Sequence, residues 1–570
     1  MSKLAFLITI SLSLLSLKAW SMGGKSLDPI DADWSVEATV TPGEPRTNIF
    51  HQAPGDWESS KERGIIHALK WPVPVTGLIV PYEPLEYFLE SDERNPIQQL
   101  VYRLSQSQIP FRDMQGLYDW LGLNPFNDER ATGIYRIPYP EGVRPDYPMG
   151  ASIIDTPRGK GLTFSCAICH SASLFGRTVM GLTNKRVRAN EFFVMAKKYI
   201  PHVPSALFKW GTNATEDERL MFRQTKYNLG SVGAVEPQVL GLDTSLPQVA
   251  LSLSRRGKDE YASKSKFYES YPRRNKLDHF VADSKPAVWW NLKHKTRWLA
   301  DGSIVSGNPV FTNFLWNELG RGTDLKELEE WMRANPEVIS DLTAAAFGTQ
   351  APRWTDFFPV STLDLDRAKR GQALFNTSCK KCHGEYLKAW DQENAASLDG
   401  ADLFATTKVI YFEKTPVKNV GTDPQRAQGM KAFADRLNEL AISKWMKTVV
   451  EPQDGYVPPP LEGIWARYPY FHNNSVPSLC ALLTKASERP AIFYQGPAND
   501  PDTDFDSECV GYPVGDQIPA QWKKEADARF DTSKAGLRNT GHEKMFLNAD
   551  GSYKWTQAQR LDLIHFLKTL

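Results

Sequence analysis

Apolar positions in the second half of the chain recur with the period of an α-helix. Between residues 363 and 376, Leu365, Ala368 and Phe375 fall on one face, while Gly371 has no side chain to block a close approach. The pattern predicts a helix over residues 363–376 that packs closely against a neighbour.

The end of the chain has the pattern of a second helix. Thr556 and Gln559 have the spacing of a capping box, in which each side chain accepts a backbone N–H of the other residue. Apolar residues then recur at helical spacing at Leu563, Phe566, Leu567 and Leu570. We expect the two helices to cross.

Strand signals are weak along the rest of the chain, where helical stretches alternate with loops rich in proline and glycine. The predicted fold is therefore mainly α, with long irregular loops and little strand. Pro352 and Pro359 mark residues 351–360 as a junction, because proline interrupts regular structure. A chain of 570 residues exceeds one core, so we expect domains at 22–350 and 351–570.

The N-terminus has the pattern of a secretory signal. Lys3 precedes an apolar stretch over residues 4–17, and the small residues Ala19 and Ser21 favour cleavage before Met22. The alternative is an uncleaved membrane anchor, although the stretch is short for a full span. Residues 1–21 are thus predicted to be a signal peptide. The mature protein is expected to be periplasmic or secreted, without a stable membrane span.

Composition adds one exclusion. Hydrophobic residues make up 41% and charged residues 24% of the chain, as in ordinary globular proteins, and the formal net charge is zero. No long block of lysine or arginine is present to hold phosphates. A nucleic-acid partner is therefore not expected.

The motif Cys-x-x-Cys-His occurs twice, at residues 166–170 and 379–383. Two thiols three residues apart on a helical turn can meet the two vinyl groups of a haem, and the following histidine can bind the iron from below. We therefore expect two covalent c-type haems in two cytochrome c-like haem domains. The predicted thioether residues are Cys166, Cys169, Cys379 and Cys382, and the predicted proximal ligands are His170 and His383.

The alternatives for either motif are a structural zinc site and a redox dithiol. Zinc would need a second ligand pair nearby, and no further CxxC or HxxxH accompanies either motif. A thioredoxin-like dithiol would be expected within a βαβ pattern, which is not evident. The two remaining cysteines, Cys480 and Cys509, are an even remainder in an oxidising compartment and are predicted to form a disulfide.

The sixth ligand of each iron decides its chemistry. An iron with two strong protein ligands transfers electrons, whereas one with an open position can bind dioxygen or peroxide. Spacing alone does not choose among the remaining histidines, which are His51, His67, His202, His279, His294, His472, His542 and His565.

Three stretches of the second half resemble the di-haem cytochrome c peroxidase superfamily. They are Arg-Gly-Gln-Ala-Leu-Phe at 370–375, Tyr-Pro-Tyr-Phe-His-Asn-Asn-Ser-Val-Pro-Ser-Leu at 468–479, and the C-terminal helix. Within that superfamily the chain is most similar to the rubber-oxygenase-like (RoxA-like) branch. Asn-Thr-Gly-His-Glu at 539–543, Lys-Pro-Ala-Val-Trp-Trp at 285–290 and Trp-Leu-Ala-Asp-Gly-Ser at 298–303 carry this closer likeness.

The resemblance implies an electron-transfer centre at the second haem. His383 would be its proximal and His542 its distal ligand, with Met545 as a rival. Peroxidases of the superfamily usually place a methionine about fourteen residues after the histidine of the 468–479 stretch, and residues 482–487 contain none. This absence favours His542. His472 would then have a structural role beside the second haem.

The first haem would be the reactive one in this resemblance. Trp289 and Trp290 resemble an aromatic–tryptophan pair close to the haems of the rubber-oxygenase branch, and they are the predicted catalytic residues. Such an apolar distal side would admit dioxygen and exclude water. Two alternatives stay open: the tryptophans are ordinary core residues, or His294 is a distal histidine that favours peroxide chemistry.

The sequence thus predicts an exported di-haem c-type cytochrome that acts as a haem-dependent oxidoreductase. Its first haem would activate dioxygen and its second would transfer electrons. The alternatives are a di-haem peroxidase acting on hydrogen peroxide and a non-catalytic electron-transfer cytochrome. Expected partners are a redox protein or small electron donor, and a small or apolar substrate. The resemblance also admits a bound calcium ion, for which no run of carboxylates identifies the ligands.

Overall fold

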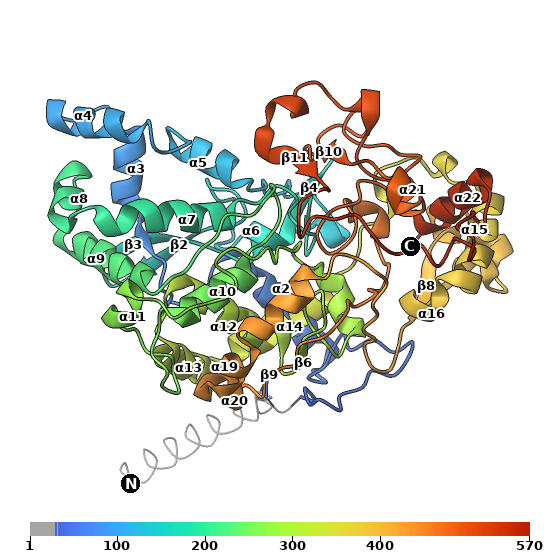
Figure 1. The fold of residues 1–570 in the computed structure, drawn as a ribbon, viewed down its shortest axis with the longest axis horizontal. Coiled ribbons are helices and arrows are strands. Elements are labelled where there is room, and N and C mark those ends of the chain that lie inside the picture. The colour runs from blue at the N-terminus through green and yellow to red at the C-terminus, as the bar shows by residue number, and fades with distance from the viewer. Residues whose placement is uncertain (1–28, 31) are drawn as a thin grey trace, which may run out of the picture.

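The computed structural model describes residues 29–30 and 32–570 (Figure 1). The expected signal peptide, residues 1–21, lies outside the described residues. The helices of the first part of the chain are α2 (Pro54–Leu69), α3 (Tyr82–Glu90), α4 (Pro96–Ser105), α5 (Met114–Leu121), α6 (Ala167–His170), α7 (Ala189–Tyr199), α8 (Ser205–Gly211), α9 (Glu216–Gly230), α10 (Ser245–Ser254), α11 (Lys266–Ser270), α12 (Pro309–Arg321), α13 (Leu325–Ala334) and α14 (Pro336–Gly348).

Most of the later helices are short, with the first and the last of them as the longer ones. They are α15 (Leu365–Ser378), α16 (Lys380–His383), α17 (Gly400–Leu403), α18 (Gln425–Gly429), α19 (Ala434–Glu439), α20 (Ala441–Trp445), α21 (Leu479–Leu482) and α22 (Gln557–Leu567). In Figure 1, α3, α4, α8 and α9 lie at one end of the long axis, and α15, α16 and α22 lie at the other.

The strands form several small antiparallel sheets. They are β1 (Val80–Pro81), β2 (Ala151–Thr156), β3 (Gly159–Phe164), β4 (Ser171–Leu174), β5 (Arg177–Met180), β6 (Ile304–Ser306), β7 (Glu385–Lys388), β8 (Thr406–Ile410), β9 (Val449–Val450), β10 (Ile492–Tyr494) and β11 (Arg529–Asp531). One sheet has the order β1-β3-β2, and the others are the pairs β4-β5, β6-β9, β7-β8 and β10-β11.

The expected fold class, mainly α with two cytochrome c-like haem domains and little strand, is wrong. The structure is 42% helical and 11% strand, a mixture of helices and several small sheets. The strands are missed because each is too short for its alternation to stand out. β4 and β5, for example, have four residues each and meet at a two-residue turn that contains Gly176 in a left-handed conformation.

The two helices that were expected to cross are confirmed. α15 begins after Asp364, whose side chain accepts a hydrogen bond from Arg367, and α22 begins with the capping box of Thr556 and Gln559. A Cβ on Gly371 would lie 2.1 Å from the carbonyl oxygen of Asp562 in α22. Glycine is therefore required where the two helices touch.

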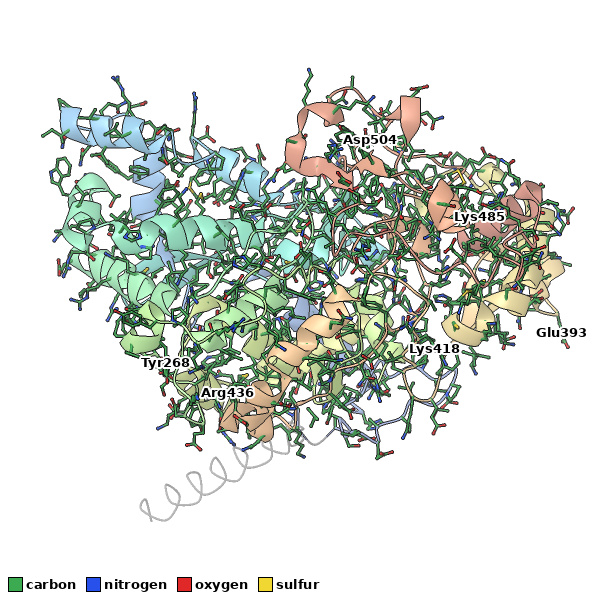
Figure 2. The ribbon with its side chains drawn as sticks, viewed as in Figure 1. Tyr268, Glu393, Lys418, Arg436, Lys485 and Asp504 are labelled. Atoms are coloured by element: carbon green, nitrogen blue, oxygen red, sulfur yellow. A yellow bond between two sulfur atoms is a disulfide. The ribbon has the colours of Figure 1, made fainter. Side chains whose placement is uncertain are left out.

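Segments from both sides of residue 350 share two of the hydrophobic cores. Phe311 and Leu315 of α12 pack in one core with Leu437 of α19, and β6 pairs with β9. Trp290 packs in another core with Trp465. Figure 2 shows the side chains on the ribbon in the view of Figure 1. The domain boundary at residue 350 stays a prediction, and the cores join the segments on either side of it.

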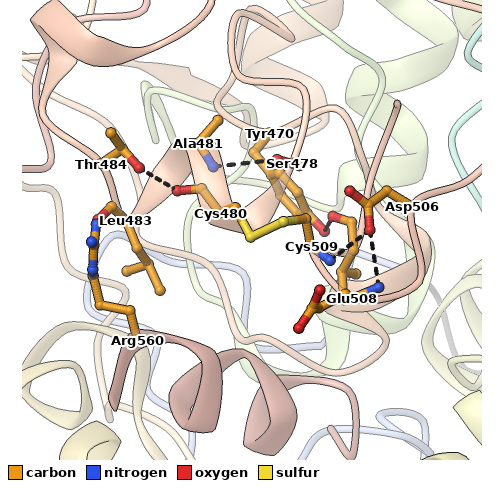
Figure 3. The surroundings of a disulfide bond; sticks show 11 residues. Tyr470, Ser478, Cys480, Ala481, Leu483, Thr484, Asp506, Glu508, Cys509 and Arg560 are labelled. Carbon is orange, nitrogen blue, oxygen red and sulfur yellow. Dashed lines mark hydrogen bonds between the residues drawn. A yellow bond between two sulfur atoms is a disulfide. The ribbon is translucent and has the colours of Figure 1, made fainter. Parts of the chain in front are cut away.

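The predicted disulfide between Cys480 and Cys509 is confirmed (Figure 3). Its Cα atoms are 4.9 Å apart, and it joins the start of α21 to a loop 29 residues later in the chain. Ser478 caps α21 by accepting a hydrogen bond from the Ala481 N–H. No helix in the described part of the chain is long and apolar enough to cross a membrane.

Candidate functional site

Residues of both Cys-x-x-Cys-His motifs line one cavity of about 500 Å³. This volume is in the range of pockets that hold cofactors, roughly 300–1,000 Å³. The cysteines of both motifs form no disulfide. The histidines and the methionine that line the cavity are His170, His383, His472, His542 and Met545.

The first motif lies on α6, a single helical turn between β3 and β4. Such a turn places Cys166, Cys169 and His170 around one end of the cavity. The Nδ1–H of His170 donates a hydrogen bond to the carbonyl oxygen of Ala287 at 2.9 Å, which leaves Nε2 as the nitrogen able to bind a metal. Burial lowers the pKa of His170 to about 4, so the imidazole is neutral, as a metal ligand must be.

The second motif has the same arrangement in a different secondary-structure context. It continues from α15 into α16, and the Nδ1–H of His383 donates to the carbonyl oxygen of Pro459 at 2.9 Å. Burial lowers the pKa of His383 to about 4 as well. A backbone acceptor on Nδ1 is the usual device that orients a histidine toward a metal. Both motifs therefore present the thiols and the imidazole nitrogen that a c-type haem requires.

His542 faces His383 across the cavity. Their ring centroids are 6.2 Å apart. Two imidazoles on opposite sides of one metal, with metal–nitrogen bonds of roughly 2.0–2.1 Å, have centroids roughly 6 Å apart. Burial lowers the pKa of His542 to about 3, and its Nδ1 is buried without a hydrogen bond to any described residue. The pair therefore fits a six-coordinate iron.

The backbone holds His542 in an uncommon conformation. His542 has a φ of 62°, and its N–H donates to the carbonyl oxygen of Val420 at 2.9 Å. A positive φ in a residue other than glycine costs energy and is often found at functional sites. Gly541, with a φ of 84°, lies so close to Gly421 that a Cβ would be 2.4 Å from the Gly421 carbonyl carbon.

Replacing Gly541 with alanine is expected to destabilise the protein and displace His542. The matched control is Gly551→Ala, because Gly551 has a φ of 81° but no atom within 4 Å of the position that a Cβ would take. The control loses roughly 1–2 kcal/mol for the left-handed backbone, and Gly541→Ala loses roughly 1–3 kcal/mol more for the clash. Urea unfolding of both variants measures the difference, and equal losses would contradict the close approach.

The structure separates the two predicted catalytic tryptophans. Trp289 lines the cavity, and its ring centroid is 5.4 Å from that of His170. It therefore lies against the imidazole that was expected to be the proximal ligand. Trp290 is fully buried outside the cavity lining, and its indole N–H donates to the carbonyl oxygen of Glu462 at 2.9 Å. A distal-side role for the pair stays a prediction.

The other candidate histidines have different surroundings. His294 does not line the cavity, and its Nε2 lies 2.6 Å from the carboxylate of Glu462. His472 lines the cavity and stacks on Tyr456 with ring centroids 3.8 Å apart. The Nε2 of His472 is buried and makes no hydrogen bond within the described chain.

Sequence reasoning missed the wall that α12 contributes. Val310, Asn313 and Asn317 of this helix line the cavity, at the i, i+3 and i+7 spacing of one helical face. That spacing was the available signal, although it is also typical of an ordinary surface helix. The N-terminus of α12 is set by Asn308, whose side chain accepts a hydrogen bond from Val310.

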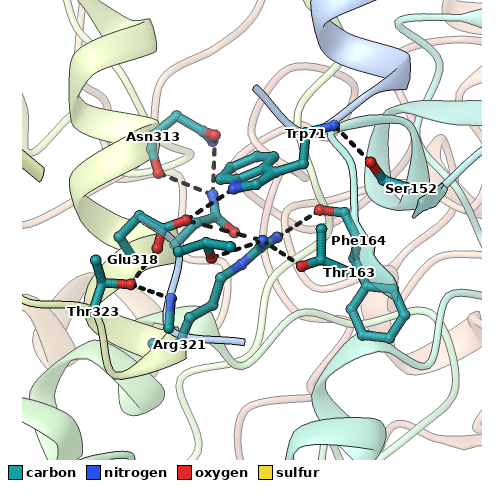
Figure 4. Close-up of polar contacts among 12 residues, drawn as sticks. Trp71, Ser152, Thr163, Phe164, Asn313, Glu318, Arg321 and Thr323 are labelled. Atoms are coloured by element: carbon teal, nitrogen blue, oxygen red, sulfur yellow. Dashed lines mark hydrogen bonds and ion pairs between the residues drawn. The ribbon is translucent and has the colours of Figure 1, made fainter. Parts of the chain in front are cut away.

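Arg321, at the end of α12, was also missed (Figure 4). Its guanidinium lies 4.0 Å from the ring centroid of Trp71 and donates to the carbonyl oxygen of Phe164 at 2.8 Å. Glu318 is its buried ion-pair partner at 3.9 Å. Phe164 closes β3 just before Cys166, so this group braces the first motif against α12.

The arrangement of possible ligand side chains gives no support for a calcium site among the described residues. Within residues 29–30 and 32–570, no group of three or more His, Cys, Asp or Glu side chains is arranged to hold a metal ion. The structure identifies no calcium ligands among them.

Two neutral histidines beside paired thiols, oriented by backbone carbonyls toward one cavity, define the class of site as that of a c-type cytochrome. Residues 455–494 match a family model described as RoxA-like, cytochrome c-like. This segment includes Pro459, which orients His383, together with His472. A cytochrome c-like domain implies a c-type haem and a haem-based redox function.

Two curated proteins, both uncharacterized, are similar to parts of this chain. The chain is 29% identical over 272 residues to uncharacterized protein y4iJ of Sinorhizobium fredii strain NGR234, which covers 39% of this chain and 42% of that protein. It is 30% identical over 237 residues to uncharacterized protein y4iM of the same strain, which covers 36% of this chain and 49% of that protein. The matches span less than half the length of each relative.

Proposed function

We propose that this protein is an exported di-haem c-type oxidoreductase of the RoxA-like kind. One haem is bound at Cys166, Cys169 and His170, and the other at Cys379, Cys382 and His383. The first haem site binds dioxygen and the second exchanges electrons. The disulfide and the paired haem-attachment motifs support export, because both are typical of oxidising compartments.

The observation that carries this proposal is that different side chains face the histidines of the two motifs. His542 faces His383, which supports closure of the second iron by protein on both sides. The ring neighbour of His170 is Trp289, and among the described residues no second histidine faces it. A haem with an open position binds dioxygen or peroxide, whereas one with two protein ligands transfers electrons.

The cavity wall supports an apolar substrate. Aromatic side chains line it beside the first motif, at Trp71, Phe193, Trp298 and Phe314. These rings exclude water and leave few hydrogen bonds for a polar molecule, so an apolar or unsaturated molecule fits best. The oxygenase interpretation requires that such an apolar molecule can reach the first motif.

A short route of contacts supports electron exchange between the motifs. His170 contacts Trp289, and the next residue, Trp290, donates its indole N–H to the carbonyl oxygen of Glu462. Glu462 is three residues after Pro459, which accepts the hydrogen bond of His383. The electrons themselves would come from a redox protein or a small donor.

The test uses protein matured in a host with c-type haem attachment. Mass spectrometry is expected to find the added mass of two haems, and titration of the reduced protein with carbon monoxide is expected to saturate at one molecule per chain. Cys166→Ser with Cys169→Ser is expected to remove one haem and all carbon monoxide binding. The matched double variant at Cys379 and Cys382 keeps the site at His170.

Three outcomes would contradict the proposal in different ways. Absence of the haem mass would reject the cytochrome interpretation. Two haems without carbon monoxide binding would leave a plain electron carrier. Rapid reduction of hydrogen peroxide with no dioxygen consumption in the presence of an apolar alkene would favour the peroxidase.

A further inference from the structure

The cavity lining carries many more positive than negative side chains. Asp243 is the carboxylate among the lining residues of the described chain. The basic residues in the same lining are Lys285, Lys295, Arg321, Lys418, Arg426 and Arg467. A cavity with this imbalance is complementary to an anionic ligand.

Two of these basic residues differ from the others because one has a carboxylate partner and the other is in contact with solvent. Arg321 is paired with Glu318, and Lys418 (labelled in Figure 2) is exposed. The remaining four are called the basic cluster: Lys285, Lys295, Arg426 and Arg467. Of these, Lys295, Arg426 and Arg467 are 7%, 4% and 9% exposed, respectively.

Three members of the basic cluster have no carboxylate partner among residues 29–30 and 32–570. The Lys285 ammonium donates to the carbonyl oxygens of Arg467 at 3.0 Å and Pro469 at 2.7 Å. Arg467 donates through Nη1 to the carbonyl oxygen of Pro460 at 2.7 Å. The Lys295 side chain lines the cavity, and its ammonium has no hydrogen bond or ion pair to a described residue. Backbone carbonyls solvate the first two cations without neutralising them.

Arg426 is partly compensated. Its Nη1 lies 3.5 Å from the buried carboxylate of Asp301, and its Nε donates to Ser284 at 3.3 Å. Nη1 itself makes no hydrogen bond to a described residue, although the side chain is 4% exposed. His472 belongs to the same neighbourhood, because Arg426 and Lys285 add to the effect of burial in lowering its pKa to about 3.

Burying these positive charges without a bound anion costs folding free energy. Burial lowers the pKa of Lys295 to about 8 and that of Lys285 well below its ordinary range, and repulsion from Arg467 adds to both effects. Burial likewise lowers the pKa of Arg467 to about 10. Buried like charges persist in folded proteins when a bound group of opposite charge neutralises them.

We propose that the basic cluster is the binding site for the propionate carboxylates of the haems held at the two motifs. A c-type haem is fixed through its vinyl carbons to the cysteines and carries two carboxylates at the opposite edge. Arginine is well suited to such groups, because its guanidinium donates two parallel hydrogen bonds to a carboxylate. Arg426 has a donor that makes no hydrogen bond to a described residue, and Arg467 lies near His383. The inference rests on the proposed function.

The test compares reduction potentials of fully matured variants. Arg426→Gln removes the charge and is expected to lower the midpoint potential of one haem, because an uncompensated propionate favours ferric iron. The ratio of ferrous to ferric haem at a fixed potential should fall about tenfold, which is about 59 mV for a one-electron couple. Arg256→Gln is the matched control, since Arg256 is fully buried, lies outside the cavity lining and should leave both potentials unchanged.

A second variant covers the case in which Arg426→Gln does not mature. Arg426→Lys keeps the charge but loses the paired donors, so the propionate bending band in resonance Raman spectra is expected to shift while the potential stays near that of the parent. An unchanged band, unchanged potentials in Arg426→Gln, or equal shifts in Arg256→Gln would overturn the propionate site. Protein that carries no haem at all would overturn the proposed function together with it.

Discussion

Replacing His542 with alanine is expected to open the second haem site. The centroid of the His542 ring lies 6.2 Å from that of His383, so its removal takes away the imidazole placed to close the iron. The reduced variant should bind two molecules of carbon monoxide per chain instead of one, and its low-spin spectrum should become partly high-spin. Visible absorption and carbon monoxide titration measure both changes.

His294→Gln is the control for this variant. His294 is 3% exposed and is bonded to Glu462, but it does not line the cavity. Glutamine keeps a donor for that carboxylate, so the spectrum and the carbon monoxide stoichiometry should stay those of the parent. A His542→Ala protein that remained fully low-spin would transfer the ligand role to a neighbour such as Met545, which also lines the cavity.

Replacing Arg489 with glutamine is expected to give the second large effect, acting on His542 through its loop. The guanidinium is buried and donates to the carbonyl oxygens of Asn539 and Gly541, directly before His542. Other donations tie the same group to the carbonyl oxygens of Ala481, Leu482 and Thr484. Loss of so many buried hydrogen bonds should lower the free energy of unfolding by about 3 kcal/mol or more.

A spectroscopic measurement distinguishes an effect of Arg489 on the position of His542 from an effect on the stability of the protein alone. Arg489→Gln should show partial high-spin character at low temperature, where the protein is folded, because the loop that carries His542 is released. Arg560→Gln is the matched control, since Arg560 donates to Leu483 in the same 481–489 region and makes no bond to residues 539–541 (Figure 3). Spectra that are identical in the two variants would show that Arg489 acts on stability alone.

Several features follow from local sequence because their physical causes are local. Gly371 sits within a helical apolar pattern, and the structure brings α15 and α22 together there. Thr556 and Gln559 cap α22 through bonds within one turn. The Cys480–Cys509 disulfide follows from an even remainder of cysteines once the two motifs are set aside.

Other features depend on segments that meet only after folding. The mainly α expectation failed around the first motif, where strands of four to six residues leave too few alternating positions to recognise. The hydrogen bond of His170 to Ala287 brings the 287–289 segment, including Trp289, against the imidazole. No local pattern encodes such a contact between residues more than a hundred positions apart.

By itself, the sequence determined the two Cys-x-x-Cys-His motifs, the disulfide and the pair of terminal helices, because covalent chemistry and helical periodicity act between near neighbours. The tertiary structure alone decided that both motifs share one cavity, that His542 faces His383, and that Lys285, Lys295, Arg426 and Arg467 all line that cavity. Those features arise from contacts between segments far apart in the sequence. Such contacts form only when the whole chain folds, so no local pattern predicts them.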